Sequence, residues 1–155
     1  MMESIESRLA ALGITLPKPA APAANYVPFV ISGTLLIISG QLPMGPEGLA
    51  YKGKVGRELD VAAGQLAARL CAINILAQAK AALQGDLSRL RRCLRLGGFV
   101  NATEWFTDHP QVINGASDLI AEVMGEAGRH ARAATGAGSL PFNAAVEVDA
   151  MFEIA

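Results

Sequence analysis

Apolar residues recur at helical spacing in three stretches of the chain. These stretches predict a short helix over residues 3–12, a long alanine-rich helix over residues 60–83, and a third helix from residue 108 to residue 125 or 128. Asp60 is suited to capping the start of the long helix, and Gly85 follows its end. Pro110 in turn favours a helix start at residues 108–110.

Shorter β-branched or alternating runs predict the strands. We expect strands over residues 26–30, 34–39, 90–100, 131–138 and 145–154, and a short edge strand over residues 51–55. The first two runs are separated by residues 31–33, which is typical of a hairpin. Residues 15–25 hold three prolines and predict an extended connector. This order of elements indicates an α+β fold with helices on one face of a mixed sheet.

The composition of the 155-residue chain favours one domain that associates with copies of itself. Hydrophobic residues make up 52% of the chain and charged residues only 17%, compared with about 25% charged residues in an average soluble domain. So few charges would cover a monomer poorly, which predicts oligomerisation. The net charge of −1 offers no electrostatic attraction for nucleic acid or a membrane surface, so neither is an expected partner.

The cysteines and histidines carry no metal or disulfide pattern. Cys71 and Cys93 are isolated within apolar sequence and are interpreted as buried free thiols. His109 and His130 lack the ligand spacing of a zinc site, so we expect no metal and no cofactor. The chain shows neither a signal peptide nor a long uncharged apolar stretch, which predicts a cytoplasmic protein without a transmembrane helix.

The candidate chemistry lies near the end of the chain, where Arg132 is followed nine residues later by Pro141 and fifteen residues later by Glu147. We expect the arginine and the glutamate on two adjacent strands, within reach of one cleft. A guanidinium offers paired donors to a substrate carboxylate, and a glutamate can activate water. The spacing therefore predicts a hydrolytic site. The alternative is a cross-strand ion pair at a subunit interface, without a substrate.

Three segments in the same order resemble the RidA family, also called YjgF or L-PSP. They are Tyr26-Val27, Ile37-Ile38-Ser39-Gly40-Gln41-Leu42-Pro43, and the final segment from Ala131 through Leu140-Pro141 to Ala150. The resemblance covers about residues 24–154 and leaves residues 1–23 as a helical extension. It implies a chorismate-mutase-like fold with two helices on one face of a mixed sheet. It also implies a homotrimer with three clefts between neighbouring subunits.

For function, the resemblance implies hydrolysis of reactive enamines and imines such as 2-aminoacrylate to a 2-oxo acid and ammonia. By position, Arg132 is similar to the family arginine that clamps the substrate carboxylate, and Glu147 to the acidic residue that positions or activates water. Further cleft-lining positions of the family match Tyr26, Ser39, the backbone amide of Gly40, Asn114 and Ala134.

The chain also departs from the family pattern. His130 stands where many deaminating members have proline, and Ala134 stands where a cysteine is common. Residues 97–110 are longer than the corresponding family stretch. Two other functions therefore stay open. One is a non-catalytic trimer that binds a small carboxylate or has a regulatory role. The other is an endoribonuclease, which would use the basic strand with Arg89, Arg91, Arg92 and Arg95.

Overall fold

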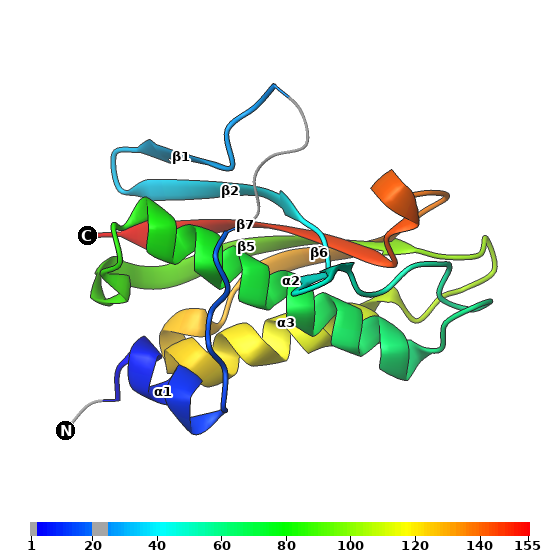
Figure 1. The fold of residues 1–155 in the computed structure, drawn as a ribbon, viewed down its shortest axis with the longest axis horizontal. Coiled ribbons are helices and arrows are strands. Elements are labelled where there is room, and N and C mark those ends of the chain that lie inside the picture. The colour runs from blue at the N-terminus through cyan, green and yellow to red at the C-terminus, as the bar shows by residue number, and fades with distance from the viewer. Residues whose placement is uncertain (1–2, 20–24) are drawn as a thin grey trace.

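A computed structural model describes residues 3–19 and 25–155 of the chain, and part of the predicted connector, residues 20–24, lies outside the described residues. A mixed five-stranded sheet has the order β1-β2-β7-β5-β6, and two helices cover one of its faces (Figure 1). The strands are β1 (Phe29–Ser32), β2 (Leu35–Gln41), β5 (Leu90–Asn101), β6 (Ala131–Ala137) and β7 (Val146–Ile154), with a separate small hairpin of β3 (Met44–Gly45) and β4 (Gly48–Leu49). The helices are α1 (Ile5–Ala11), α2 (Val61–Ala82) and α3 (His109–Met124), with short 3-10 turns η1 (Leu87–Arg89), η2 (Gly125–Gly128) and η3 (Pro141–Asn143).

The three predicted helices are confirmed, and their starts have local causes. The Asp60 carboxylate accepts a hydrogen bond from the amide of Ala63 at 2.8 Å and so caps α2. Pro110 lies in the first turn of α3, where its missing N–H costs no helical hydrogen bond. The short helix α1 buries Leu9 and packs on α3.

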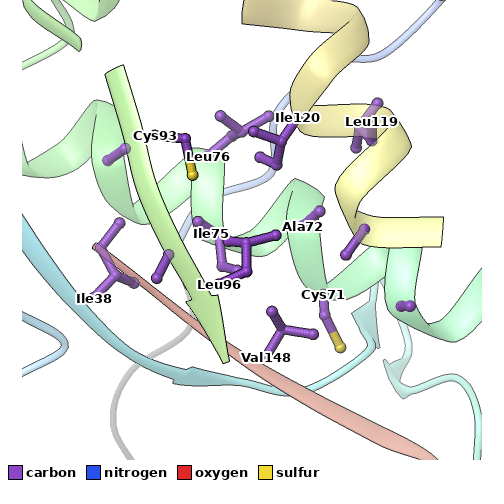
Figure 2. Close-up of a cluster of buried hydrophobic side chains, with 14 of the residues drawn as sticks. Ile38, Cys71, Ala72, Ile75, Leu76, Cys93, Leu96, Leu119, Ile120 and Val148 are labelled. Atoms are coloured by element: carbon purple, nitrogen blue, oxygen red, sulfur yellow. The ribbon is translucent and has the colours of Figure 1, made fainter. Parts of the chain in front are cut away.

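The core lies between the sheet and the helix layer (Figure 2). In this layer α2 contacts β2 and β7, while α3 contacts β5 and β6. By length and composition α2 is apolar enough to cross a membrane, but here it is a buried core helix. Cys71 and Cys93 are fully buried free thiols, as predicted. Burial raises the pKa of Cys71 well above its usual range and that of Cys93 to about 12, so both remain protonated packing residues.

The other face of the sheet, called here the open face, bears no helix among the described residues. Along β7, Val146 and Val148 are buried under the helices, whereas the alternating Glu147 and Asp149 are half-buried on the open face. The strict alternation of apolar and acidic residues along β7 accounts for this orientation of the two carboxylates. Register and exposure place Val30, Leu35, Ile37 and Phe99 on the same face.

Two expectations about strands are wrong. Residues 51–55 form isolated bridges at Lys52 and Val55 rather than an edge strand, because Gly53 and Gly56 have φ values of 115° and 95° that interrupt extended backbone. The strands β6 and β7 are not adjacent, since β5 lies between them. The β5–α3–β6 crossover places β6 parallel to one edge of β5, and β7 pairs antiparallel with the other edge.

Candidate functional site

Arg132 lies on the edge strand β6, and its guanidinium is held against α3. One terminal nitrogen, Nη1, donates to Ser117 Oγ at 3.0 Å, and Nη2 donates to the carbonyl of Pro110 at 3.3 Å. Each terminal nitrogen is therefore fixed by one bond to α3, and the remaining N–H donors are available to an incoming carboxylate.

Ser117 and His130, neither of them among the predicted site residues, complete this cluster. Ser117 Oγ lies 2.9 Å from His130 Nε2, and His130 Nδ1 lies 2.6 Å from the carbonyl of Gly128. A signal for Ser117 exists in the sequence, because it follows Asn114 by three residues and so shares its face of α3.

Two other predicted site residues, Asn114 and Ala134, lie on the same two elements as Ser117 and Arg132. Asn114 is half-buried on α3, and Ala134 follows Arg132 by two residues on β6 and so shares its face of the strand. We call Asn114, Ser117, His130, Arg132 and Ala134 the edge group.

Glu147 lies elsewhere, on the open face and directly against Gly40. A Cβ atom at position 40 would stand 2.8 Å from Glu147 Cδ, so only glycine leaves the carboxyl in this place. Burial, and next the neighbouring Asp149, raises the pKa of the Glu147 carboxyl. Burial also raises the pKa of Asp149, while Arg95, whose Nη1 lies 3.4 Å from Asp149 Oδ1, opposes that rise.

Ser39 and Tyr26 belong to the β1–β2 side of the sheet. Ser39 Oγ donates to the carbonyl of Pro28 at 3.1 Å, next to Gly40 in β2. Tyr26 precedes β1 and is exposed. Ser39, Gly40 and Glu147 form a second cluster, which we call the open-face group.

One chain does not bring Arg132 and Glu147 together. Arg132 is in register with Leu96 of β5, which is buried under the helices, whereas Glu147 is in register with Phe99, which is exposed on the open face. The two side chains therefore lie on opposite faces of the sheet, with β5 between their strands. A cross-strand ion pair between them within one chain is excluded.

Within the long segment 97–110, residues 102–106 and 109 form one wall of a cavity of about 590 Å³ near the start of α3. Trp105 is 73% exposed in this wall, whereas Phe106 is half-buried and packs on the core. Across the cavity, Lys54 Nζ donates to Asn101 Oδ1 and to the carbonyl of Gly138. Among residues 3–19 and 25–155, no group of His, Cys, Asp and Glu is placed to hold a metal ion.

Comparison with known proteins identifies the family. The family model described as "YjgF/chorismate mutase-like, putative endoribonuclease" matches residues 6–154. Protein TCP17 of Trypanosoma cruzi is 52% identical over 151 residues, which are 97% of this chain and 94% of that protein. The chain belongs to the YjgF (RidA) family.

Solved structures of relatives share the fold. A crystal structure of Atu1372 from Agrobacterium tumefaciens, described as having unknown function, is 61% identical with a TM-score of 0.92 and covers 97% of this chain and 92% of that chain. A crystal structure from Shewanella oneidensis MR-1, described as "a putative endoribonuclease", is 40% identical with a TM-score of 0.95 and covers 98% and 100% of the two chains. The predicted chorismate-mutase-like fold of the family is thereby confirmed.

Within the RidA family, the close matches lie in a divergent branch, which agrees with the departures of this chain from the family pattern at His130 and Ala134. His130 itself is a member of the edge group, where its Nε2 lies within hydrogen-bond distance of Ser117 Oγ. The basic strand is only partly free, since Arg95 contacts Asp149 and Arg89 Nε donates to the carbonyl of Ala155 at 2.9 Å.

Proposed function

We propose that this protein is a cytoplasmic homotrimer that hydrolyses small carboxylate-bearing enamines and imines, such as 2-aminoacrylate, to a 2-oxo acid and ammonia. The reaction takes place in a cleft between subunits, where the edge group of one subunit faces the open-face group of its neighbour. The observation that carries the proposal is that one chain holds both a pre-oriented guanidinium at one edge of the sheet and a half-buried carboxylate of raised pKa on the open face.

Arg132 acts as the carboxylate clamp. A guanidinium that is already held by Ser117 Oγ and the Pro110 carbonyl loses little freedom when it binds a ligand. Its planar fork matches the two oxygens of a carboxylate, so the substrate is bound in one orientation. The clamp fixes the position of the neighbouring C=N carbon relative to the base.

Glu147 acts as the general base. The enamine first becomes the imine by moving a proton from its nitrogen to its terminal carbon, and the imine nitrogen takes a proton from the solvent. Glu147 then accepts a proton from a water molecule while the water oxygen bonds to the iminium carbon, which gives a neutral carbinolamine. The protonated Glu147 gives this proton to the amine nitrogen, the C–N bond breaks with its electron pair leaving on ammonia, and the carbinolamine hydroxyl loses its proton to the carboxylate as the C=O bond of the 2-oxo acid forms. The raised pKa of Glu147 makes the carboxylate a stronger base than an exposed glutamate.

The trimer is supported by the exposed apolar side chains of the open face. Val30 is 49% exposed, Ile37 is 40% exposed and Phe99 is 36% exposed, and they lie on the same face of the sheet as the two carboxylates. Apolar surface of this kind is typical of an association site. Light scattering should return about three times the chain mass of 16.1 kDa. A stable monomer at micromolar concentration would contradict the shared cleft.

The decisive experiment measures ammonia released from 2-aminoacrylate that is generated in situ. Glu147→Gln keeps the shape of the side chain but cannot accept a proton, so turnover should fall to the spontaneous rate while pyruvate binding by calorimetry persists. Glu153→Gln on the same strand is the matched control and should retain turnover. If the wild type binds pyruvate but its turnover equals that of Glu147→Gln, the protein is a carboxylate-binding trimer instead.

Endoribonuclease activity is the second candidate, because the family description and the Shewanella structure both name it. Arg91 and Arg92 are exposed on β5 and would contact phosphates. RNA cleavage that weakens steeply with salt and disappears in an Arg91→Ala, Arg92→Ala double variant would favour this activity over imine hydrolysis.

A further inference from the structure

We infer that Ser117 and His130 form a hydrogen-bond relay that positions Arg132 for its ligand. This inference rests on the proposed function, because the ligand is the carboxylate that Arg132 clamps. The relay runs from the carbonyl of Gly128 through the imidazole and the hydroxyl to the guanidinium.

The direction of each hydrogen bond follows from the chemistry of its partners. The Gly128 carbonyl can only accept, so in the neutral imidazole Nδ1 carries the hydrogen and donates it at 2.6 Å. The other ring nitrogen, Nε2, is then an acceptor and receives the Ser117 hydroxyl at 2.9 Å. With its hydrogen so placed, Ser117 Oγ presents a lone pair to Arg132 Nη1 at 3.0 Å.

The relay explains why a serine is held in the middle of α3. A serine hydroxyl inside a helix commonly turns back to bond the helix backbone. Here His130 draws the hydroxyl hydrogen away from the guanidinium, so the oxygen is oriented to accept from Arg132. Because this oxygen already accepts a bond from Arg132, Ser117 is a positioning residue and not a nucleophile.

The backbone around the relay is rigid, so the relay can hold the guanidinium of Arg132 in one orientation. Gly128 is buried, and a Cβ there would stand 2.5 Å from the carbonyl oxygen of Ile120, so the turn is packed directly on α3. His130 is two residues from Gly128 and two residues from Arg132, at the point where the chain enters β6. The second bond of Arg132, to the Pro110 carbonyl, fixes the other side of the fork.

Two measurements on the full-length protein test the relay. The first is a long-range ¹H–¹⁵N NMR spectrum of the His130 ring at a pH where the ring is neutral. The relay requires hydrogen on Nδ1 and none on Nε2. The Nε2–H tautomer would overturn the inference, whether or not the protein hydrolyses imines.

The second measurement is pyruvate affinity by calorimetry in a double-mutant cycle. Ser117→Ala and His130→Phe should each weaken binding by about three- to tenfold, the effect of one hydrogen bond. Because His130 acts through Ser117, the double variant should bind no more weakly than Ser117→Ala alone. Ser117→Thr and His130→Gln, which keep the hydroxyl and an acceptor, should restore most of the affinity.

The possible outcomes separate the relay from the proposed function. Glu122→Ala on the exposed side of α3 is the control for a change of helix stability and should bind as the wild type does. Additive losses, or unchanged affinity in both single variants, would overturn the relay while leaving imine hydrolysis intact. If the wild type does not bind pyruvate, the proposed function fails, and the tautomer of His130 still decides the relay.

Discussion

Gly40→Ala is the most direct perturbation of the proposed base, because it acts on Glu147 without changing that residue. The added Cβ would stand 2.8 Å from Glu147 Cδ and 3.1 Å from its Oε2. Non-bonded carbon atoms prefer about 3.5–4.0 Å, so the carboxyl must move by roughly 1 Å. The displaced group is the free end of a half-buried side chain, so the fold accommodates the change by moving the carboxyl.

The expected loss of activity follows from this displacement. A misplacement of about 1 Å between reacting groups costs on the order of 100-fold in rate, which corresponds to about 2.7 kcal/mol of activation free energy. The turnover number for imine hydrolysis, measured as ammonia release, should fall by this factor. Pyruvate affinity should fall by much less than turnover, because the Arg132 clamp is unchanged in this variant.

The control for this variant is Gly45→Ala in the small β3–β4 hairpin, where the nearest atom to the new Cβ, Ala50 Cβ, lies at 3.7 Å, an ordinary van der Waals distance. It should keep wild-type turnover. A folded Gly40→Ala protein with wild-type turnover would refute the assignment of Glu147 as the base, because the carboxyl would then have moved without consequence.

Three further variants test other parts of the argument. Arg132→Lys keeps the charge but loses the fork, and calorimetry should show pyruvate binding weakened by roughly ten- to a hundredfold, with unchanged affinity contradicting the clamp. Asp149→Asn removes the neighbouring negative charge, which is the second cause of the raised pKa of Glu147. Activity is lost as the pH falls through that pKa, so the acid limb of the pH profile of turnover should move to lower pH. An upward shift, or none, would exclude an effect of Asp149 on the pKa of Glu147. Gly115→Ala would place a Cβ 2.0 Å from the backbone oxygen of Gln65. Although alanine is the better helix former, the free energy of unfolding measured with denaturant should fall by about 1–3 kcal/mol or more. Equal or higher stability would contradict the tight α2–α3 contact.

The local structure is predictable from the sequence where residues within a segment determine it. Asp60 and Pro110 mark the starts of α2 and α3, and the alternation along β7 assigns Glu147 to the face opposite the helices. The first strand begins at Phe29 rather than Tyr26. Pro28 has no N–H to donate, and its carbonyl closes the pairing by accepting from the amide of Ser39 at 3.0 Å.

The order of the strands is not predictable in the same way, because it depends on which edge of β5 each later strand occupies. Arg132 and Glu147 are fifteen residues apart, and strands that follow one another in sequence usually pair. Here the crossover through α3 places β6 on one edge of β5 and leaves the other edge to β7. The relay partner Ser117 was missed for a related reason, since its contact with Arg132 joins residues that only the fold brings together.

The separation of Arg132 from Glu147 makes the shared cleft directly testable by subunit mixing. Arg132→Lys and Glu147→Gln should each be nearly inactive alone, but each variant contributes the group that the other lacks. In mixed trimers refolded from equal amounts, a cleft has an even chance of receiving an intact arginine from one subunit and an even chance of receiving an intact glutamate from its neighbour. Ammonia release should therefore recover to about a quarter of the wild-type rate. Because β5 and opposite sheet faces keep the two residues apart within one chain, a mixture that stays inactive although light scattering and mass spectrometry show mixed trimers would refute the inter-subunit site.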